Sequence, residues 1–276
     1  MDTIQKLKVG LVAFLFLSVA GTPLVWAEDS ERPWKTLTIK GGWYYPIQDT
    51  NVRLDGTGPF GGGVELDLED DLDLKEDVSS YRIDAEWRFF SRHRLNFSFF
   101  DLSRDATSTL TKTITIPTTP PTNFVIGDSV DSLWDWKVYA ASYTWSFLQT
   151  DTYEVGFNIG VHITDIAIGI RTLNGLVEEA EAVTAPLPVL GLTGAYAFTP
   201  KLILRSNAGF FALKIDDFKG SLVNFDLDLE YNMWKYMGFG IGYNFFRMDL
   251  DVTADKFNGS AKYQYNGFKA FIKFYL

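Results

Sequence analysis

The feature that most constrains the fold is a strict alternation of apolar and polar residues in the segment 221–233, which reads SLVNFDLDLEYNM. Apolar side chains occupy every second position from Val223 to Met233, and the positions between them carry asparagines and carboxylates. A period of two is the pattern of a β-strand, because successive side chains point to opposite faces. Carboxylates avoid a dry core, so one face of this strand contacts water and the other an apolar medium.

The same alternation recurs along most of the chain, in the segments 81–89, 153–163, 237–245 and 268–276 and, more weakly, 201–210. The connections between these segments alternate in length. Short turns are expected near 91–93, 149–151, 199–201 and 234–236, and longer polar connections at 47–77, 107–131, 171–184, 216–220 and 251–259. Short turns at one end and long loops at the other are typical of outer-membrane barrels.

We therefore predict an all-β fold, a single closed antiparallel up-and-down transmembrane β-barrel of ten strands, with eight or twelve as alternatives. The predicted strands are 35–46, 78–90, 94–106, 133–148, 152–170, 185–198, 201–215, 219–233, 237–250 and 261–276. An even number places both termini at the end with the short turns. A soluble β-sandwich would also show alternating strands, but it does not require loops that alternate in length.

The first residues have the pattern of a secretory signal peptide. Lys6 and Lys8 precede the apolar run 9–20, and small residues including Ala27 follow it. We expect residues 1–27 to be cleaved, leaving residues 28–276 as the barrel domain. The alternative, a retained membrane anchor, needs about 20 apolar residues, more than this run provides.

Composition excludes two classes of function. Without residues 1–27 the chain has 23 basic and 34 acidic residues and a formal charge of −11, which excludes a general nucleic-acid binder. There is no cysteine, and therefore no disulfide, thiol nucleophile or cysteine-ligated metal. We expect no cofactor.

The final segment, FKAFIKFYL, is apolar at every second position, from Phe268 through Ala270, Ile272 and Phe274 to Leu276. It resembles the terminal signal that the barrel assembly machinery recognises, with Leu276 where a phenylalanine is usual. The whole chain from residue 28 resembles a small, porin-like outer-membrane β-barrel of Gram-negative bacteria. The resemblance implies outer-membrane lipids, lipopolysaccharide and the assembly machinery as partners, periplasmic termini and extracellular long loops.

The face opposite the apolar one carries charges of both signs on the strands whose phase is clear. These residues are Arg82, Asp84, Glu86, Arg88, Glu154, Arg205, Asp226, Asp228, Glu230, Lys269 and Lys273. A barrel of about eight strands is filled by its own side chains, so we expect these charges to pair and block the lumen. The inward stripe Gly238, Gly240 and Gly242 either receives long side chains or leaves a narrow path for small solutes.

Chemical signals are sparse. His162 is the only histidine on a strand face, with Asp165 three residues further on, and a hydrogen-bonded lumenal histidine is the simpler reading. We expect a non-enzymatic barrel that is structural, surface-interacting or a very narrow channel. The first alternative is a hydrolase at the outer rim that uses His162 as base on lipid or peptide. The second is a soluble secreted binding protein.

Two predicted loops stand out by composition. The acidic loop 65–77 contains Asp67, Asp70, Asp71 and Asp73, which are candidate ligands for Ca²⁺ or Mg²⁺. Their spacing does not match the EF-hand loop, so a solvated acidic loop is the preferred interpretation. The loop 107–122 is rich in Thr and Pro and suits recognition without naming a ligand. Pro186 and Pro188 fall at the outer end of a predicted strand, where a missing N–H costs little.

Overall fold

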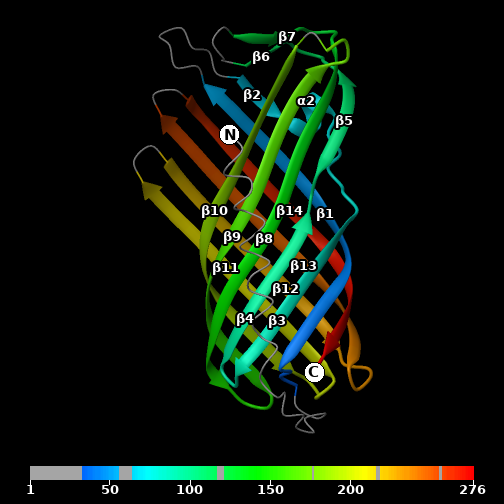
Figure 1. Ribbon diagram of the computed structural model, residues 1–276, viewed down its shortest axis with the longest axis vertical. Coiled ribbons are helices and arrows are strands. Elements are labelled where there is room, and N and C mark those ends of the chain that lie inside the picture. The colour runs from blue at the N-terminus through cyan, green and yellow to red at the C-terminus, as the bar shows by residue number, and fades with distance from the viewer. Residues whose placement is uncertain (1–32, 56–63, 117–120, 176, 216–217, 255–256) are drawn as a thin grey trace, which may run out of the picture. The chain divides into compact units, whose positions relative to one another are not determined.

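In a computed structural model of the chain, the described residues are 33–276 except 56–63, 117–120, 176, 216–217 and 255–256. Ten long strands close into one antiparallel barrel, which confirms the predicted fold and strand number (Figure 1). The strands are β1 (Leu37–Asp55), β3 (Ser80–Phe90), β4 (His93–Asp101), β8 (Ser129–Gln149), β9 (Tyr153–Thr172), β10 (Glu178–Ala197), β11 (Leu202–Ile215), β12 (Phe218–Tyr231), β13 (Met237–Ala254) and β14 (Phe257–Tyr275). The predicted signal peptide lies outside the described residues.

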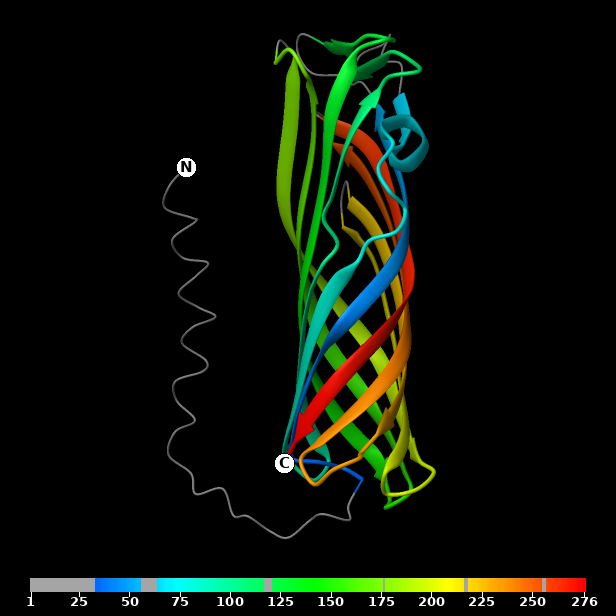
Figure 2. The ribbon, with the colours of Figure 1, turned by 90° about the vertical axis from the view of Figure 1, so that its right-hand side faces the viewer.

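The last strand seals the barrel against the first. β14 pairs with β1 from Thr38↔Tyr275 to Asp55↔Asn258, and the pairing has no register shift along its length. The backbone N–H of Leu276 donates to the carbonyl of Leu37 at 2.9 Å. The start of β1 and the C-terminus therefore lie together at the end with the short turns, at the bottom of Figure 2.

Short elements decorate the opposite end. β5 (Arg104–Thr109) follows β4 and pairs with β8, and β2 (Val64–Asp67) pairs with β1. β6 (Ile114–Ile116) and β7 (Thr122–Phe124) form a separate hairpin, and α2 (Leu68–Leu72) is a single short helix. Among the described residues, no α-helix has the length and apolar composition needed to cross a membrane.

Two of the predicted long loops are wrong, because the strands continue through them. β9 and β10 pair as far as Arg171↔Glu178, so most of the predicted loop 171–184 is strand. β13 and β14 likewise pair as far as Ala254↔Phe257 within the predicted loop 251–259. Polar residues such as Arg171, Glu178 and Asp251 face outward on these strands, which need not stop where the apolar surface ends.

The polarity of the two faces inverts along the length of a strand. On β9 the outward side chains from Tyr153 to Ile163 are apolar, a stretch of eleven residues, which matches the 9–11 residues that a tilted strand needs to cross a bilayer. Beyond Ile163 the outward face carries Asp165 and Arg171, while Ile170 on the inward face is 8% exposed. The barrel therefore has an apolar belt at the short-turn end and a polar-walled part above it, which we call the tower.

The tower has an apolar core of its own. Trp136 and Tyr263 pack against each other with ring centroids 4.2 Å apart and ring planes tilted by 43°, and both are almost fully buried. Tyr263 also packs against Trp134, and its hydroxyl donates to Gln48 Oε1 at 2.5 Å. Leu68 of α2 is completely buried against this cluster. The inside of the tower is thus packed like the core of a soluble protein, and we call it the aromatic core.

Candidate functional site: the lumen of the barrel

The lumen within the apolar belt is filled by paired charges. Each of the eleven charged residues predicted to face inward takes part in at least one ion pair there. Two further cations, Lys40 and Arg94, join the network. Sequence reasoning missed both, although Leu95, Phe97 and Phe99 alternate on the opposite face of β4 and so placed Arg94 inward.

One cluster surrounds Glu154 of β9 near the short turns. Arg88 of β3 donates to both carboxylate oxygens, at 2.8 and 2.9 Å. Arg94 of β4 approaches at 3.4 Å, and the hydroxyl of Ser146 also donates to Glu154. The Glu154 side chain is 1% exposed. A bidentate arginine pair with extra donors is the arrangement in which a buried carboxylate is tolerated.

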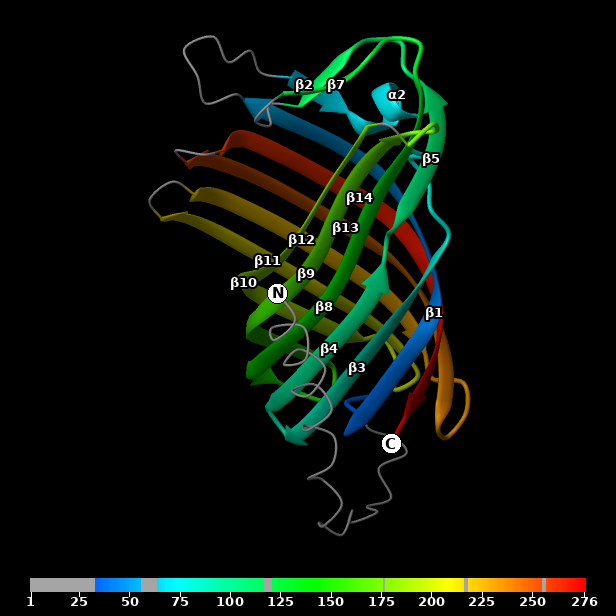
Figure 3. The same ribbon diagram turned by 45° about the horizontal axis from the view of Figure 1, so that its top comes forward.

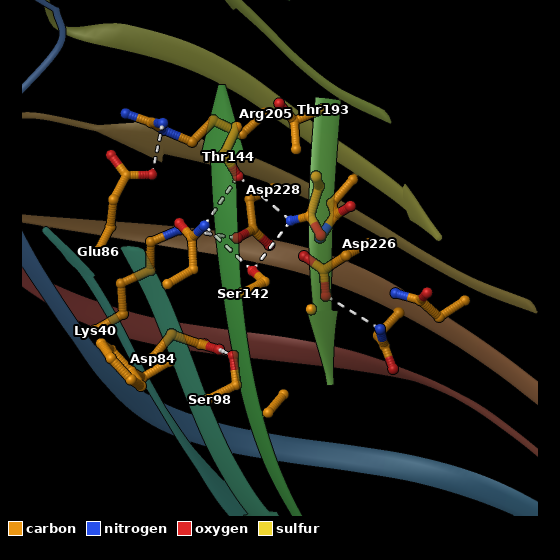
Figure 4. A pocket seen from close by; sticks show the side chains of 18 of the residues that line it. Lys40, Asp84, Glu86, Ser98, Ser142, Thr144, Thr193, Arg205, Asp226 and Asp228 are labelled. Carbon is orange, nitrogen blue, oxygen red and sulfur yellow. Dashed lines mark hydrogen bonds and ion pairs between the residues drawn. The ribbon is translucent and has the colours of Figure 1, made fainter. Parts of the chain in front are cut away.

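A second cluster surrounds Glu230 of β12. Lys40 of β1 lies 2.5 Å from one carboxylate oxygen, and Lys273 of β14 lies 2.6 Å from the other. Arg205 of β11 lies 3.3 Å from Glu230 and 3.5 Å from Glu86, which also pairs with Arg94. Arg205 therefore connects the two clusters across the lumen, as Figure 4 shows for Arg205 and Glu86.

A third layer lies above these clusters. Lys269 bridges Asp226 at 2.7 Å and Asp228 at 2.8 Å. Arg82 pairs with Asp84 at 2.9 Å and approaches Asp226 at 3.4 Å. The two clusters and this third layer together form what we call the charge network. It holds six carboxylates and seven cations, so the charges almost cancel, and each charged group has a partner of opposite sign.

Two glycines of the β13 stripe, Gly240 and Gly242, are covered by side chains. A Cβ atom on Gly242 would lie 2.1 Å from Asp228 Oδ1 and 2.6 Å from Lys269 Cε. A Cβ atom on Gly240 would lie 2.4 Å from Cζ of the Phe271 ring. Glycine is needed here because a lumenal ion pair and an aromatic ring rest directly on the backbone. At these two positions the structure shows packing of long side chains, the first of the two expectations for the stripe.

Between the charge network and the aromatic core lies a cavity of about 170 Å³. Amides and hydroxyls form part of its wall, including those of Asn96, Asn158 and Asn224, and Phe246 contributes an aromatic side. Figure 4 shows Ser98, Ser142 and Thr144 in the same wall. Asn158 donates to Ser142 Oγ at 3.1 Å, so part of this wall is internally hydrogen-bonded. A cavity of this size with several polar groups in its wall is large enough for water molecules.

His162 lines the same cavity. Its Nδ1 is buried and has no hydrogen-bond partner among the described residues. Asp165 faces outward and accepts a hydrogen bond from Thr184 at 2.6 Å, and Glu154 is held by arginines. Neither carboxylate is in place to orient the ring of His162, so the arrangement that makes a histidine a general base does not form around it.

The acidic segment 65–77 is ordered by β2 and α2 rather than being a loop throughout, while Asp70, Asp73 and Asp77 remain exposed to solvent. The Asp67 side chain caps α2 by accepting from the N–H groups of Glu69 and Asp70, and Asp71 pairs with Lys112 at 2.6 Å. Asp73 ends the helix in a left-handed conformation, φ 57°. The structure shows no group of three or more potential metal ligands in the part of the chain that it describes.

Glu69 of α2 attaches this segment to the barrel. Its carboxylate lies 2.5 Å from Arg104, and it accepts a hydrogen bond from the backbone of Thr50 at 2.9 Å. Burial raises the pKa of the Glu69 carboxyl above its ordinary value, although the contact with Arg104 acts in the opposite direction.

A closed ten-stranded barrel with an apolar belt and a charged interior has the fold of bacterial outer-membrane β-barrels. OmpT, an outer membrane protease of Escherichia coli, is similar over 87% of this chain and 97% of its own, with 9% identity and a TM-score of 0.53. The attachment invasion locus protein Ail of Yersinia pestis matches 84% of this chain and 98% of its own (8% identity, TM-score 0.35).

The toluene transporter TbuX of Ralstonia pickettii matches 88% of this chain and 90% of its own, with 10% identity and a TM-score of 0.34. No protein-family model matches the sequence, and no curated protein matches it. The TM-score to OmpT, at 9% identity, shows a shared fold alone and leaves activity to be argued from the site.

Proposed function

We propose that this protein is an integral outer-membrane β-barrel that is non-enzymatic and non-conducting, and that its tower is a surface-interacting body. The observation that carries the proposal is the inversion of polarity along the strands. The charge network closes the lumen within the apolar belt, and the aromatic core closes it a second time within the tower. A continuous aqueous path would have to pass at least the charge network.

Exposed apolar side chains support the membrane location. Ile241 on β13 is 62% exposed, Phe210 on β11 59% and Phe268 on β14 68%. In water such a belt would be an aggregation site, whereas hydrocarbon solvates it. Exposed aromatic residues such as Trp234 near the short turns and Trp43 towards the tower suit the two interfacial girdles of such barrels.

The proposed orientation has the short turns and the termini in the periplasm and the tower outside the cell. Residues 1–27 are then the cleaved signal peptide and residues 28–276 the mature barrel. Phe268, Ile272, Phe274 and Leu276 form the assembly signal, and outer-membrane lipids and lipopolysaccharide surround the belt. Protease added to whole cells tests this orientation: cleavage confined to the tower supports it, and cleavage at the short turns contradicts it.

Planar-bilayer recording of the purified protein tests the closed lumen. We expect no steady conductance steps, because buried ion pairs and a packed aromatic core leave no room for hydrated ions. Steady unitary conductance in the wild type would overturn the proposal and favour the narrow-channel interpretation.

The alternative is a hydrolase that uses His162, and one observation favours testing it: a buried imidazole nitrogen without a partner borders a polar cavity. Turnover of lipid A, phospholipid and peptide should be assayed with the wild type and with His162→Ala. No turnover by the wild type removes the alternative. Turnover that His162→Ala abolishes would replace the non-enzymatic proposal.

A further inference from the structure

The wall of the barrel is incomplete between β10 and β11. β10 pairs with β9 from Glu178 to Tyr196, but its pairing with β11 extends only from Leu190 to Ala197. Residues 178–189 of β10 therefore have no described strand on that side, and residues 211–215 of β11 pair only with β12. Figures 1 and 3 show the upper ends of β10 and β11 diverging.

The unpaired edge of β10 contains two prolines, Pro186 and Pro188. Proline has no N–H to donate to a neighbouring strand, and within sheets it is confined to edges. Edge prolines and charges also prevent a further strand from adding to a sheet, and Glu178 and Glu179 lie on the same edge. The sequence of β10 thus keeps this edge free rather than offering it to a peptide or to a second copy.

The opening begins within the apolar belt. Pro186 and Pro188 of β10 lie opposite Ile163 and Val161 of the neighbouring strand β9, and these two residues belong to the belt. At the foot of the opening, Leu190 is 52% exposed on the outer face. The membrane hydrocarbon therefore reaches the opening directly.

Inside the opening the surface is also apolar. Leu187 of β10 and Phe211 of β11 are partly buried and pack against the aromatic core, as do Ile166 and Ile168 of β9. We call the opening bounded by Leu187 and Phe211 the lateral window. Leu190 lies on the outer side of the gap and Leu187 and Ile166 on its inner side, with His162 and Thr164 facing inward between the last two. Apolar side chains on both sides of a gap that borders hydrocarbon suit contact with an alkyl chain.

We propose that the lateral window binds the hydrocarbon chain of an amphiphile taken from the outer leaflet. The chain lies between Leu187 and Phe211 and covers Ile166 and Ile168, while the polar end stays at the upper edge of the belt. The proposal rests on the membrane location proposed above. Because burial of each methylene is favourable, affinity should rise by about fourfold for each added carbon until the wall is covered.

The test uses the full chain refolded in amphipol, without lipid, and 11-(dansylamino)undecanoic acid as a fluorescent probe. We expect saturable binding that palmitate displaces more strongly than octanoate. Leu187→Trp fills the window and should weaken binding at least tenfold. The matched control, Leu190→Trp, places the same ring on the lipid-facing side of the same strand and should leave binding unchanged. Absence of saturable binding, or equal losses in both variants, would overturn the proposal.

Two further measurements complete the test. Heat-dependent gel mobility and vesicle flotation show whether each variant is folded and inserted, so that failure of the membrane proposal is seen separately from failure of chain binding. Native mass spectrometry of protein extracted from membranes shows whether the bound hydrocarbon chain belongs to a membrane lipid or to a free fatty acid. Retained phospholipid or lipid A that Leu187→Trp lacks identifies a membrane lipid as the ligand, and retained free fatty acid identifies the free acid. Equal retention by both variants would contradict a specific chain site.

Discussion

Lys273 and Glu230 form an ion pair inside the barrel, with Nζ 2.6 Å from Oε2 and with side chains that are 2% and 0% exposed. Lys40 and Arg205 bind the same carboxylate from two other strands. Glu230 is thus the point at which β1, β11, β12 and β14 are held together across the lumen. A buried carboxylate with three cationic partners ties these four strands together.

Glu230→Gln should strongly destabilise the barrel. The substitution keeps the shape but leaves Lys40, Lys273 and Arg205 with less compensating charge, and breaking a buried pair costs about 3–5 kcal/mol. Urea unfolding in lipid vesicles measures the loss. Asp251→Asn removes an exposed pair with Lys219, whose side chain is 71% exposed, and should change stability by less than about 0.5 kcal/mol. Equal effects would mean that the charge network is not a structural unit.

Gly242→Ala should destabilise the barrel by about 1–3 kcal/mol, because the new methyl group would overlap Asp228 and Lys269. Gly41→Ala on β1 is the matched control, since a Cβ atom there meets nothing within 4 Å. It should be neutral or slightly stabilising, because glycine is unfavourable in strand interiors. If both substitutions were tolerated equally, the side chains would not rest on the β13 backbone.

Ile159→Arg should destabilise the inserted barrel by about 2–4 kcal/mol, because Ile159 lies in the middle of the belt and is 57% exposed. Ala167→Arg lies on the outer face of the same strand, above Ile163, where the wall is polar. Its cost should fall to about 0–1 kcal/mol, as at an interface. Reversible unfolding in vesicles gives both values. An equal cost at the two positions would contradict the inversion of polarity between belt and tower.

Attachment of α2 should depend on pH through Glu69. Because burial raises the pKa of this carboxyl in the folded state, the folded protein binds the proton more tightly than the unfolded chain. The contribution of Glu69 to the free energy of unfolding is therefore greatest below its ordinary pKa and declines as pH rises through the folded pKa. The stability of wild type relative to Glu69→Gln, from urea unfolding between pH 4 and pH 8, should fall with rising pH. A rise would show that Arg104 outweighs burial.

The sequence alone determined the strands, the belt and the inward charges. Alternation such as Val223, Phe225 and Leu227 against Asp226 and Asp228 fixes which side chains share a face, because strand geometry is local. The same alternation, together with the short turns, predicts a closed antiparallel barrel. Strands whose apolar face contacts lipid must form a closed sheet, because an open sheet edge would leave backbone groups without hydrogen-bond partners in hydrocarbon.

Tertiary structure decided the rest. Which cation meets Glu230 depends on the register of four strands that are distant in sequence, and alternation along one strand cannot specify it. The predicted loops beyond Ile163 became a tower because the aromatic core, assembled from Trp136, Tyr263 and their neighbours on separate strands, supports strands outside the membrane. The unpaired edge at Pro186 also depends on where β11 turns away, which no alternation along one strand can specify.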